Sequence, residues 1–308
     1  METTVRSYRD EDDYWLVRAF LREVFRLNGG RELSWQVYRF DYWRWHGIEN
    51  LGRGRLEDSV FIWETLHGQI AAVLNREGPG HVFLQVHPDF GTRELEEEMI
   101  TVAERYLARP LPEGRRKLIV WVDSEDGVRQ GIVARRGYAG GGEPEYQRRR
   151  AMSMPIPDAP VAEGYTVRAL GSGDELPARS WASWRAFHPD EPDDRYEGWE
   201  WYRNIQRAPL YRRDLDIVAV APSGEFAAFC TIWFDDVTRT GSFEPVGTVP
   251  EHRRRGLGKA VMYEGLHRLR RLGADVAHVG SGSPPAHALY ASVGFTEYDL
   301  SEPWFNEF

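Results

Sequence analysis

The chain contains an internal repeat, which restricts it to folds built from two similar halves. The run TVRSYRDEDD near the start returns as TVRALGSGDE, and three further segments return in the same order with nearly the same spacing. Matches that keep their order along a chain are the signature of a duplicated unit. The matching pairs begin at Thr4 and Thr166, His67 and Ser223, Pro88 and Pro250, and Ile132 and Leu289.

Segment 151–164 separates the two halves. Its sequence, AMSMPIPDAPVAEG, contains three prolines and no helical periodicity, as expected of a linker or of an edge strand exchanged between the halves. A chain of 308 residues is also long enough for two ordinary domains. We therefore expect one domain at 1–154 and a second at 155–308.

Each half is expected to be an α/β domain, with helices flanking a mixed, mostly antiparallel central sheet. Consecutive strands followed by β-α-β elements indicate antiparallel pairing first and parallel pairing later. In the second half we expect strands at 165–169, 215–221, 226–234, 242–249, 275–280 and 295–300, and helices at 174–187, 194–206, 256–272 and 285–292.

The turn PEHRRRGLGKA, residues 250–260, joins a strand to a helix and predicts an anion site. A helix start offers free backbone N–H groups and the positive end of the helix dipole. Gly256 and Gly258 let a bulky diphosphate approach the main chain, and Arg254, Arg255 and Lys259 add positive charge. The alternative is a solvated basic turn, but cations there oppose the dipole, and each glycine weakens the helix by about 1 kcal/mol.

Two further motifs accompany this turn. The Arg-x-x-Gly-x-Gly pattern follows the strand FEPVGTV and Pro250, and AHALYASVGF runs from Ala286 to Phe295. Together these motifs resemble those of the GNAT superfamily of N-acetyltransferases, over residues 164–300. The resemblance implies transfer of an acetyl group from acetyl-CoA to an amine by direct attack, with no covalent enzyme intermediate and no metal.

The resemblance also implies which residues bind the coenzyme. The pantetheine arm would enter a gap beside the central strand like an added strand, and the pyrophosphate would sit on the turn. Ser283 stands where the family often has an asparagine that makes a minor coenzyme contact. The implied coenzyme-binding residues are Val246, Gly247, Thr248, Arg254, Arg255, Gly256, Leu257, Gly258, Lys259 and Ser283.

Tyr290 falls on the family's general-acid position, where it would protonate the departing thiolate if held within hydrogen-bond reach. The alternative is a tyrosine that only packs in the core. A base must also deprotonate the substrate ammonium, because only the neutral amine is nucleophilic. Glu244 on the central strand is the candidate, and His188 is the second choice.

The first half lacks two requirements of this pattern. Aligned on the two prolines, it has glutamates where the second half has its two glycines and its lysine, and a valine in place of the tyrosine. Negative side chains there would stabilise the helix but repel a pyrophosphate. We expect the first half to keep the fold, to bind no acetyl-CoA and to supply one wall of the acceptor cleft. The substituted residues are Glu94, Glu96, Glu97 and Val133.

The acceptor is expected to be a small-molecule amine, with a cationic amine as one option. Residues 181–204, WASWRAFHPDEPDDRYEGWEWYRN, mix acids with aromatic rings that can hold a cation. The alternative is two amphipathic helices with a solvated acidic face and a buried Trp stripe. Other functions left open are a non-catalytic acyl-CoA-binding or regulatory protein, and acetylation of a protein N-terminus or lysine.

Composition excludes several other classes of protein. The net charge of −9 argues against nucleic-acid binding, which depends on phosphate neutralisation. No apolar stretch approaches the length of a membrane span, and the charged N-terminus lacks a signal peptide, so we expect a cytoplasmic protein. The single cysteine, Cys230, excludes a Cys-x-x-Cys zinc site and is expected in a buried strand. The sequence leaves the oligomeric state open.

Overall fold

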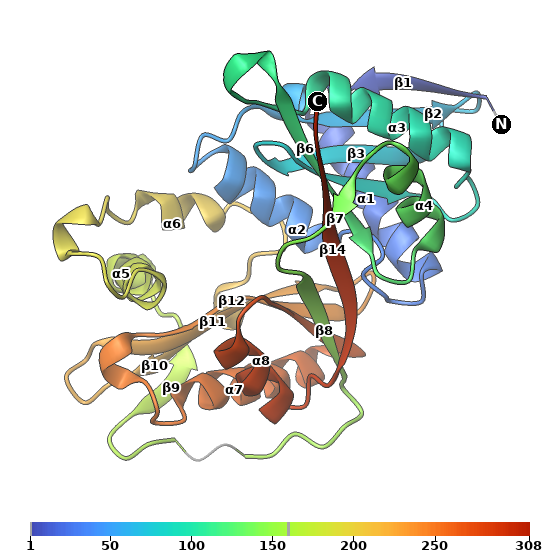
Figure 1. Cartoon of the computed structure of the whole chain (residues 1–308). Helices are drawn as coiled ribbons and strands as arrows, with labels where there is room; N and C mark the ends of the chain where they lie inside the picture. Colours follow the sequence, from blue (N-terminus) through green and yellow to red (C-terminus); the bar gives the residue numbers. More distant parts are fainter. Residues whose placement is uncertain (1, 159–160) are drawn as a thin grey trace. The chain divides into compact units, whose positions relative to one another are not determined.

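The computed structural model describes residues 2–158 and 161–308 and divides the chain into two compact units (Figure 1). The first unit comprises Met1–Gln147 together with Asp299–Phe308, and the second comprises Arg148–Tyr298. The division lies a few residues before the boundary expected near 155, and the last residues of the chain return to the first unit. Residues 159–160 of the expected linker lie outside the described residues.

The first unit is built on a mixed sheet in the order β1-β2-β3-β4-β6-β14. Every neighbouring pair is antiparallel except β4 and β6, which are parallel. Its elements are β1 (Thr3–Ser7), α1 (Glu11–Leu27), α2 (Val37–Tyr42), β2 (Val60–Thr65), β3 (Ile70–Gly78), β4 (His81–Val86), α3 (Arg93–Tyr106), β5 (Arg109–Pro110), β6 (Arg116–Asp123), α4 (Gly127–Arg135), β7 (Ala139–Gly140) and most of β14 (Glu297–Glu307).

The second unit repeats this plan with the sheet order β8-β13-β12-β11-β10-β9. The expected mixed α/β fold is confirmed, although the helix expected at 194–206 is shorter. Its elements are most of β8 (Glu145–Ala151), then β9 (Thr166–Ala169), α5 (Leu176–Phe187), α6 (Glu200–Ile205), β10 (Asp216–Val220), β11 (Phe226–Asp235), β12 (Thr240–Thr248), α7 (Leu257–Leu272), β13 (Val276–Ser281) and α8 (Pro284–Ser292).

Each half of the sequence supplies a strand to the unit of the other half. The strand expected at 295–300 as the end of the second domain is β14, which extends to Glu307 and pairs with β6 of the first unit from Ser301↔Asp123 to Glu307↔Lys117. In return, β8 ends the first half of the sequence and lies beside β13. An exchanged strand is one of the two interpretations of segment 151–164 given above. The exchange occurs just before this proline-rich segment.

Helices α5 and α7 cover opposite faces of the second sheet (Figure 1). Alternate residues of β11 contact each helix, as strand geometry requires. Thr231 accepts a hydrogen bond from Arg179 of α5 at 3.0 Å, and the buried thiol of Cys230 lies 3.3 Å from the Val261 carbonyl of α7. Cys230 is therefore a core residue on a buried strand, as expected.

The long helix of each unit buries equivalent positions. In the alignment that pairs Pro88 with Pro250, the buried face of α3 falls on the buried face of α7. This agreement supports the repeat at the level of packing, because only a shared helix orientation keeps the same positions inside. The equivalent buried pairs are Leu95 and Leu257, Met99 and Val261, Ile100 and Met262, and Ala103 and Gly265.

The parallel strand pair in each unit opens after a few residues. Strands β4 and β6 are paired at His81↔Ile119 and Val82↔Val120, and β12 and β13 are paired from Thr240↔Val276 to Ser242↔His278. Beyond these pairs, residues 243–248 of β12 are in register with β11 alone among the described strands. One backbone edge of β12 is thus left for another partner. None of the described helices is both long and apolar enough to cross a bilayer.

Candidate active site

A β-bulge on β12 marks the point where this strand leaves β13. Cys230 lies opposite Val246 and Ile232 lies opposite Phe243, so the single residue between them on β11 faces both Glu244 and Pro245. A bulge bends the strand that carries the extra residue, and proline is tolerated there because no ladder bond is lost. The bend carries the rest of β12 away from its parallel neighbour.

The segment after the bulge, Val246 to Thr248, is half-buried and extended. A larger residue than glycine would not fit at position 247 without a shift of its neighbour, because a Cβ there would lie 2.4 Å from the Phe229 ring on the neighbouring strand. The backbone edge opposite β11 can accept an extended ligand as an added strand would be accepted. The structure therefore gives the residues expected to hold the pantetheine arm an edge suited to that contact.

The start of α7 is shaped as an anion site. Gly256 occupies the N-cap with φ 78°, Arg254 has φ 64°, and no side chain of the described residues caps this helix start. A Cβ on Gly256 would meet nothing within 4 Å, so the backbone is open on that side. Lys259 is exposed beside it, and these groups together can bind a diphosphate.

Gly258 shows that three elements meet at this helix start. A Cβ there would lie 3.3 Å from Leu289 of α8 and 3.5 Å from Thr248 of β12. Leu257, its neighbour, is buried in the core. The start of α7, the end of β12 and helix α8 therefore come together, as the predicted coenzyme site requires.

Tyr290 lies in α8 and is 7% exposed. Burial raises the pKa of its phenol above the usual range, and the negative charge of Glu244 raises this pKa further. The structure therefore places the two expected catalytic residues close enough to interact electrostatically. A protonated phenol beside a carboxylate can supply both the acid and the base of an acyl transfer.

Two further expected residues lie at helix ends. His188 ends α5, stacks on the ring of Trp184 at 5.6 Å and lies 3.0 Å from the Trp184 carbonyl. Ser283 is exposed at the N-cap of α8, and its side chain forms no capping hydrogen bond there. The contacts of His188 are those of a helix-terminal residue, whereas Ser283 remains open to a ligand.

One arginine of the turn has a role that its sequence does not reveal. Arg253 donates to the carbonyl of Thr248 at 3.3 Å and to that of Ala186 at 3.1 Å, so it ties the turn to β12 and α5. In addition, the Tyr165 hydroxyl lies 2.9 Å from a ring nitrogen of His252. Three adjacent arginines look alike in sequence, and only their surroundings separate the structural one from the exposed Arg254 and Arg255.

Residues 181–204, the segment expected to bind the acceptor, form an aromatic cluster rather than a fully buried Trp stripe. Trp181 and Trp184 stack at 5.4 Å, and Tyr196 approaches them at 5.1 Å and 5.7 Å. All three rings are half-buried. Aromatic rings with partly open faces can bind a cationic group.

The equivalent helix starts of the first unit are closed by their own side chains. Thr92 caps α3 by accepting from the Leu95 N–H at 3.2 Å, and Asp126 caps α4 by accepting from the Arg129 N–H at 2.9 Å. In the second unit, neither α7 nor α8 has such a cap within the described residues. In the first unit, backbone N–H groups at these helix starts donate to side chains of the unit itself. In the second unit, the equivalent groups can bind a ligand.

A buried ion pair in the first unit occupies part of the space equivalent to the predicted coenzyme site. Glu96, which corresponds to Gly258, accepts from Arg129 at 2.8 Å. The guanidinium of Arg129 also lies 3.4 Å from the carbonyl of Leu84, which corresponds to Val246. The backbone carbonyl that would face a coenzyme therefore has an internal donor instead.

Three kinds of similarity agree with this geometry. Residues 175–295 match the acetyltransferase (GNAT) family. The mycothiol acetyltransferase of Arthrobacter sp. (strain FB24) is 26% identical over 254 residues, covering 77% of this chain and 73% of that protein. That of Salinispora arenicola (strain CNS-205) is 31% identical over 163 residues, covering 50% and 52%.

Solved structures resemble the whole chain. A GCN5-related N-acetyltransferase from Sphaerobacter thermophilus superimposes with a TM-score of 0.68 at 17% identity, covering 99% of this chain and 95% of the other. A tandem GNAT protein from the clavulanic acid biosynthesis pathway gives a TM-score of 0.67 at 16% identity, covering 99% and 98%. The two-unit architecture is thus a known arrangement.

Proposed function

We infer that this chain is a tandem GNAT N-acetyltransferase that carries out its reaction in the second unit and uses acetyl-CoA as the acetyl donor. The observation that carries this proposal is the meeting of the uncapped start of α7, the open edge of β12 and Tyr290 on α8. Acetyl-CoA is the usual donor in this family, and its diphosphate and pantetheine arm match the first two features.

The coenzyme is proposed to bind in two segments. Its diphosphate accepts from the backbone N–H groups at the start of α7, with Arg254, Arg255 and Lys259 adding charge. The pantetheine arm lies along Val246–Thr248, and Ser283 contributes a hydroxyl at the start of α8. This arrangement would bring the thioester towards Tyr290.

The acetyl group is proposed to move in one direct attack. Glu244 accepts a proton from the substrate ammonium, and the neutral amine attacks the thioester carbonyl carbon. A C–N bond forms, the C–S bond breaks, and Tyr290 protonates the departing thiolate; the surplus proton on the amide nitrogen then restores the phenol through solvent. These groups have the acid and base roles that the reaction needs.

The charge of Glu244 couples the two proton transfers. Burial raises the pKa of Tyr290 most, and Glu244 raises it further while ionised. Once it has accepted the ammonium proton, Glu244 is neutral, and this contribution to the Tyr290 pKa disappears. Tyr290 therefore becomes the stronger acid at the stage when the thiolate forms.

The acceptor is proposed to be the primary amine of a small molecule. The relatives named as mycothiol acetyltransferases support a small-molecule acceptor. The half-buried cluster of Trp181, Trp184 and Tyr196 supports a cationic one, as do the acidic residues between Trp184 and Tyr196 in the sequence, Asp190, Glu191, Asp193 and Asp194. Partly open aromatic faces beside carboxylates attract an ammonium more strongly than a neutral group.

A thiol-release assay with a panel of amines tests the proposal. We expect acetyl-CoA-dependent release of free thiol with at least one class of small amine, and loss of that release in Tyr290→Phe and Gly256→Glu. Tyr298→Phe, which alters an exposed tyrosine outside the site, should retain it. Tight acetyl-CoA binding with no thiol release across small amines, peptide N-termini and lysines would instead identify a regulatory acyl-CoA-binding protein.

A further inference from the structure

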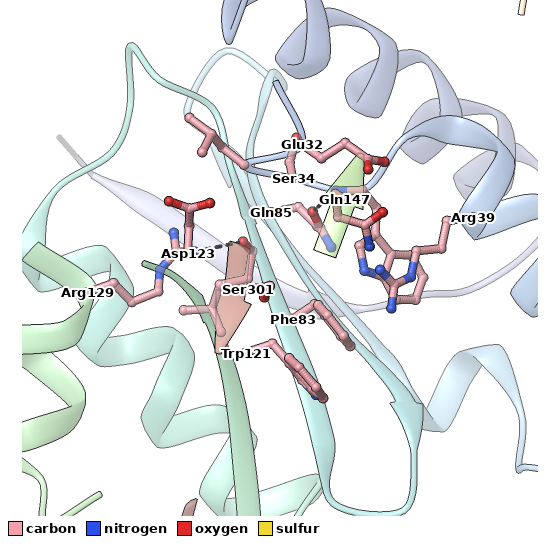
Figure 2. A pocket seen from close by; sticks show the side chains of 13 residues that line it. Glu32, Ser34, Arg39, Phe83, Gln85, Trp121, Asp123, Arg129, Gln147 and Ser301 are labelled. Carbon is pink, nitrogen blue, oxygen red and sulfur yellow. Dashed lines mark hydrogen bonds between the residues drawn. The ribbon is translucent and has the colours of Figure 1, made fainter. Parts of the chain in front are cut away.

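The first unit contains a pocket that the proposed reaction does not use. It lies where β4 and β6 diverge, and it is bounded by Phe83 and Gln85 of β4, Trp121 and Asp123 of β6, and residues 32–35 before α2 (Figure 2). Arg129 forms part of its wall. The ion pair of Arg129 with Glu96 thus occupies only part of the gap between the strands.

Two buried polar groups at this pocket have no hydrogen-bond partner among the described residues. They are the hydroxyl of Ser34, a residue 7% exposed, and the indole N–H of Trp35, a residue 4% exposed. Buried donors in folded proteins are nearly always satisfied, so an unsatisfied pair lining one pocket indicates an absent partner. Both groups are hydrogen-bond donors.

A carboxylate oxygen is also unpartnered here. Oε1 of Glu32 accepts from Gln36 at 2.6 Å, whereas the buried Oε2 has no partner within the described residues. Figure 2 shows Glu32 and Ser34 on the same side of the pocket. Burial raises the pKa of Glu32 to about 8, so the empty pocket holds this group protonated at neutral pH.

The charges around the pocket favour a cation. Arg39 is already paired with Glu77 and Glu145, and Arg129 with Glu96 and Asp126; the distances in these pairs run from 2.8 to 3.5 Å. These pairings neutralise both arginines of the wall. Two carboxyl groups, Glu32 and Asp123, remain to interact with a ligand.

We propose that this pocket binds a small ammonium-bearing molecule with a hydrogen-bond acceptor close to its charge. The ammonium donates to Oε2 of Glu32, and the acceptor receives hydrogen bonds from the Ser34 hydroxyl and the Trp35 indole N–H. Phe83 and Trp121, stacked at 5.8 Å, form an apolar side against the carbon chain. The residues of this site belong to the first unit, whereas those of the proposed coenzyme and acceptor sites belong to the second.

Binding should change the protonation of Glu32. An ammonium beside the carboxyl stabilises its ionised form, so complex formation near pH 7 should release up to about one proton per molecule bound. An anionic ligand would keep Glu32 protonated and release none. The proton balance therefore separates the two ligand classes.

The indole N–H of Trp35 offers a site-specific test in the full chain. Its ¹H–¹⁵N NMR signal is assigned by its loss in Trp35→Phe, and 2-aminoethanol is titrated as the probe, with ethylene glycol as its neutral counterpart and glycolate as an anionic one. We expect a downfield shift of this signal with 2-aminoethanol and proton release by calorimetry in two buffers. Shifts confined to Trp181 or Trp184, or an equal response to ethylene glycol or glycolate, would overturn the proposal.

A charge-removing variant supplies the second test. Glu32→Gln should weaken 2-aminoethanol binding by about tenfold or more, because a charged hydrogen bond is lost, while Glu23→Gln on the exposed face of α1 should not weaken it. Gly256→Glu should retain binding, since it alters only the second unit, so this result stands apart from any failure of the proposed acetyl transfer. Unchanged binding by a folded Glu32→Gln chain would contradict the assignment.

Discussion

Arg129 donates to Glu96 across 2.8 Å in the first unit, at the two positions where the second unit has Ala286 and Gly258. The two units thus differ in the side chains at these equivalent positions. The first unit keeps a basic residue, Arg93, at the start of α3, so positive charge alone does not make the site. Open backbone at the helix start distinguishes the second unit.

The full chain should bind one acetyl-CoA. We expect calorimetric titration to give one molecule per chain, and Gly256→Glu to abolish it, because this variant adds a negative charge at the phosphate position and strains a residue with φ 78°. The matched control is Glu94→Gly, the reverse change at the equivalent position of the first unit, which should leave the ratio at one. A ratio of two in the unaltered chain would show that the first unit also binds the coenzyme.

Gly247→Ala should destabilise the chain and weaken acetyl-CoA binding together. The new Cβ would lie 2.4 Å from the Phe229 ring, and overpacking of this kind costs about 1–3 kcal/mol. Gly173→Ala is the control, because a Cβ there meets nothing within 4 Å. Urea denaturation gives the free energies of unfolding, and equal values for the two variants would contradict the close packing of β12 on β11.

Tyr290→Phe should lower kcat by about 100-fold or more, the usual contribution of a general acid, with little change in KM for acetyl-CoA. The phenol donates a proton during the reaction, but it is not assigned a contact with the coenzyme diphosphate or pantetheine. Steady-state kinetics with a responsive amine would measure both constants. A variant that loses affinity while keeping kcat would assign Tyr290 to the packing of α8.

The pH dependence of kcat should report the interaction of Glu244 with Tyr290. Because burial and the charge of Glu244 both raise the Tyr290 pKa, the phenol stays protonated beyond about pH 10, where free tyrosine ionises. The alkaline fall in kcat is therefore expected above pH 10 in the unaltered chain. Glu244→Gln removes the second cause, so its alkaline fall should begin at lower pH, in addition to a lower kcat; an unchanged profile would show that the two residues do not interact.

Removing one partner of the Arg129–Glu96 ion pair should lower the free energy of unfolding more than replacing both partners. Arg129→Met leaves Glu96 buried without its arginine, which typically costs about 3–5 kcal/mol, whereas Arg129→Met with Glu96→Leu should recover most of that loss. Denaturant unfolding of both variants and of the Glu96→Leu chain completes the cycle. Additive effects would mean that the pair contributes no coupling.

Much of the fold could be predicted because its helices and strands follow from local patterns in the sequence. Helix α7 was expected at 256–272 and begins at Leu257, since its apolar spacing and the preceding glycine are both visible in the sequence. The strand at 295–300 was expected too, but its partner was not. Alternating side chains indicate that a segment is a strand, whereas the strand beside it is selected by contacts between residues distant in sequence.

The candidate site was predictable where backbone chemistry dominates. The glycines at a helix start and the tyrosine that matches the family's motif can be identified in the sequence, and the structure places them on neighbouring elements. The role of Arg253 as a tie between β12 and α5, and the cap and ion pair that close the first unit, depend on which atoms meet in space. Nor could sequence show that the Ser34 hydroxyl and the Trp35 indole N–H lack hydrogen-bond partners among the described residues.

The exchange of β14 affects the order in which this protein can fold during synthesis. A ribosome makes β6 long before β14, yet the seven pairs from Ser301 to Glu307 give β6 its antiparallel neighbour. The sheet of the first unit therefore stays one strand short until residues 301–307 have been synthesised. Loss of these residues would damage the unit whose other strands were made first.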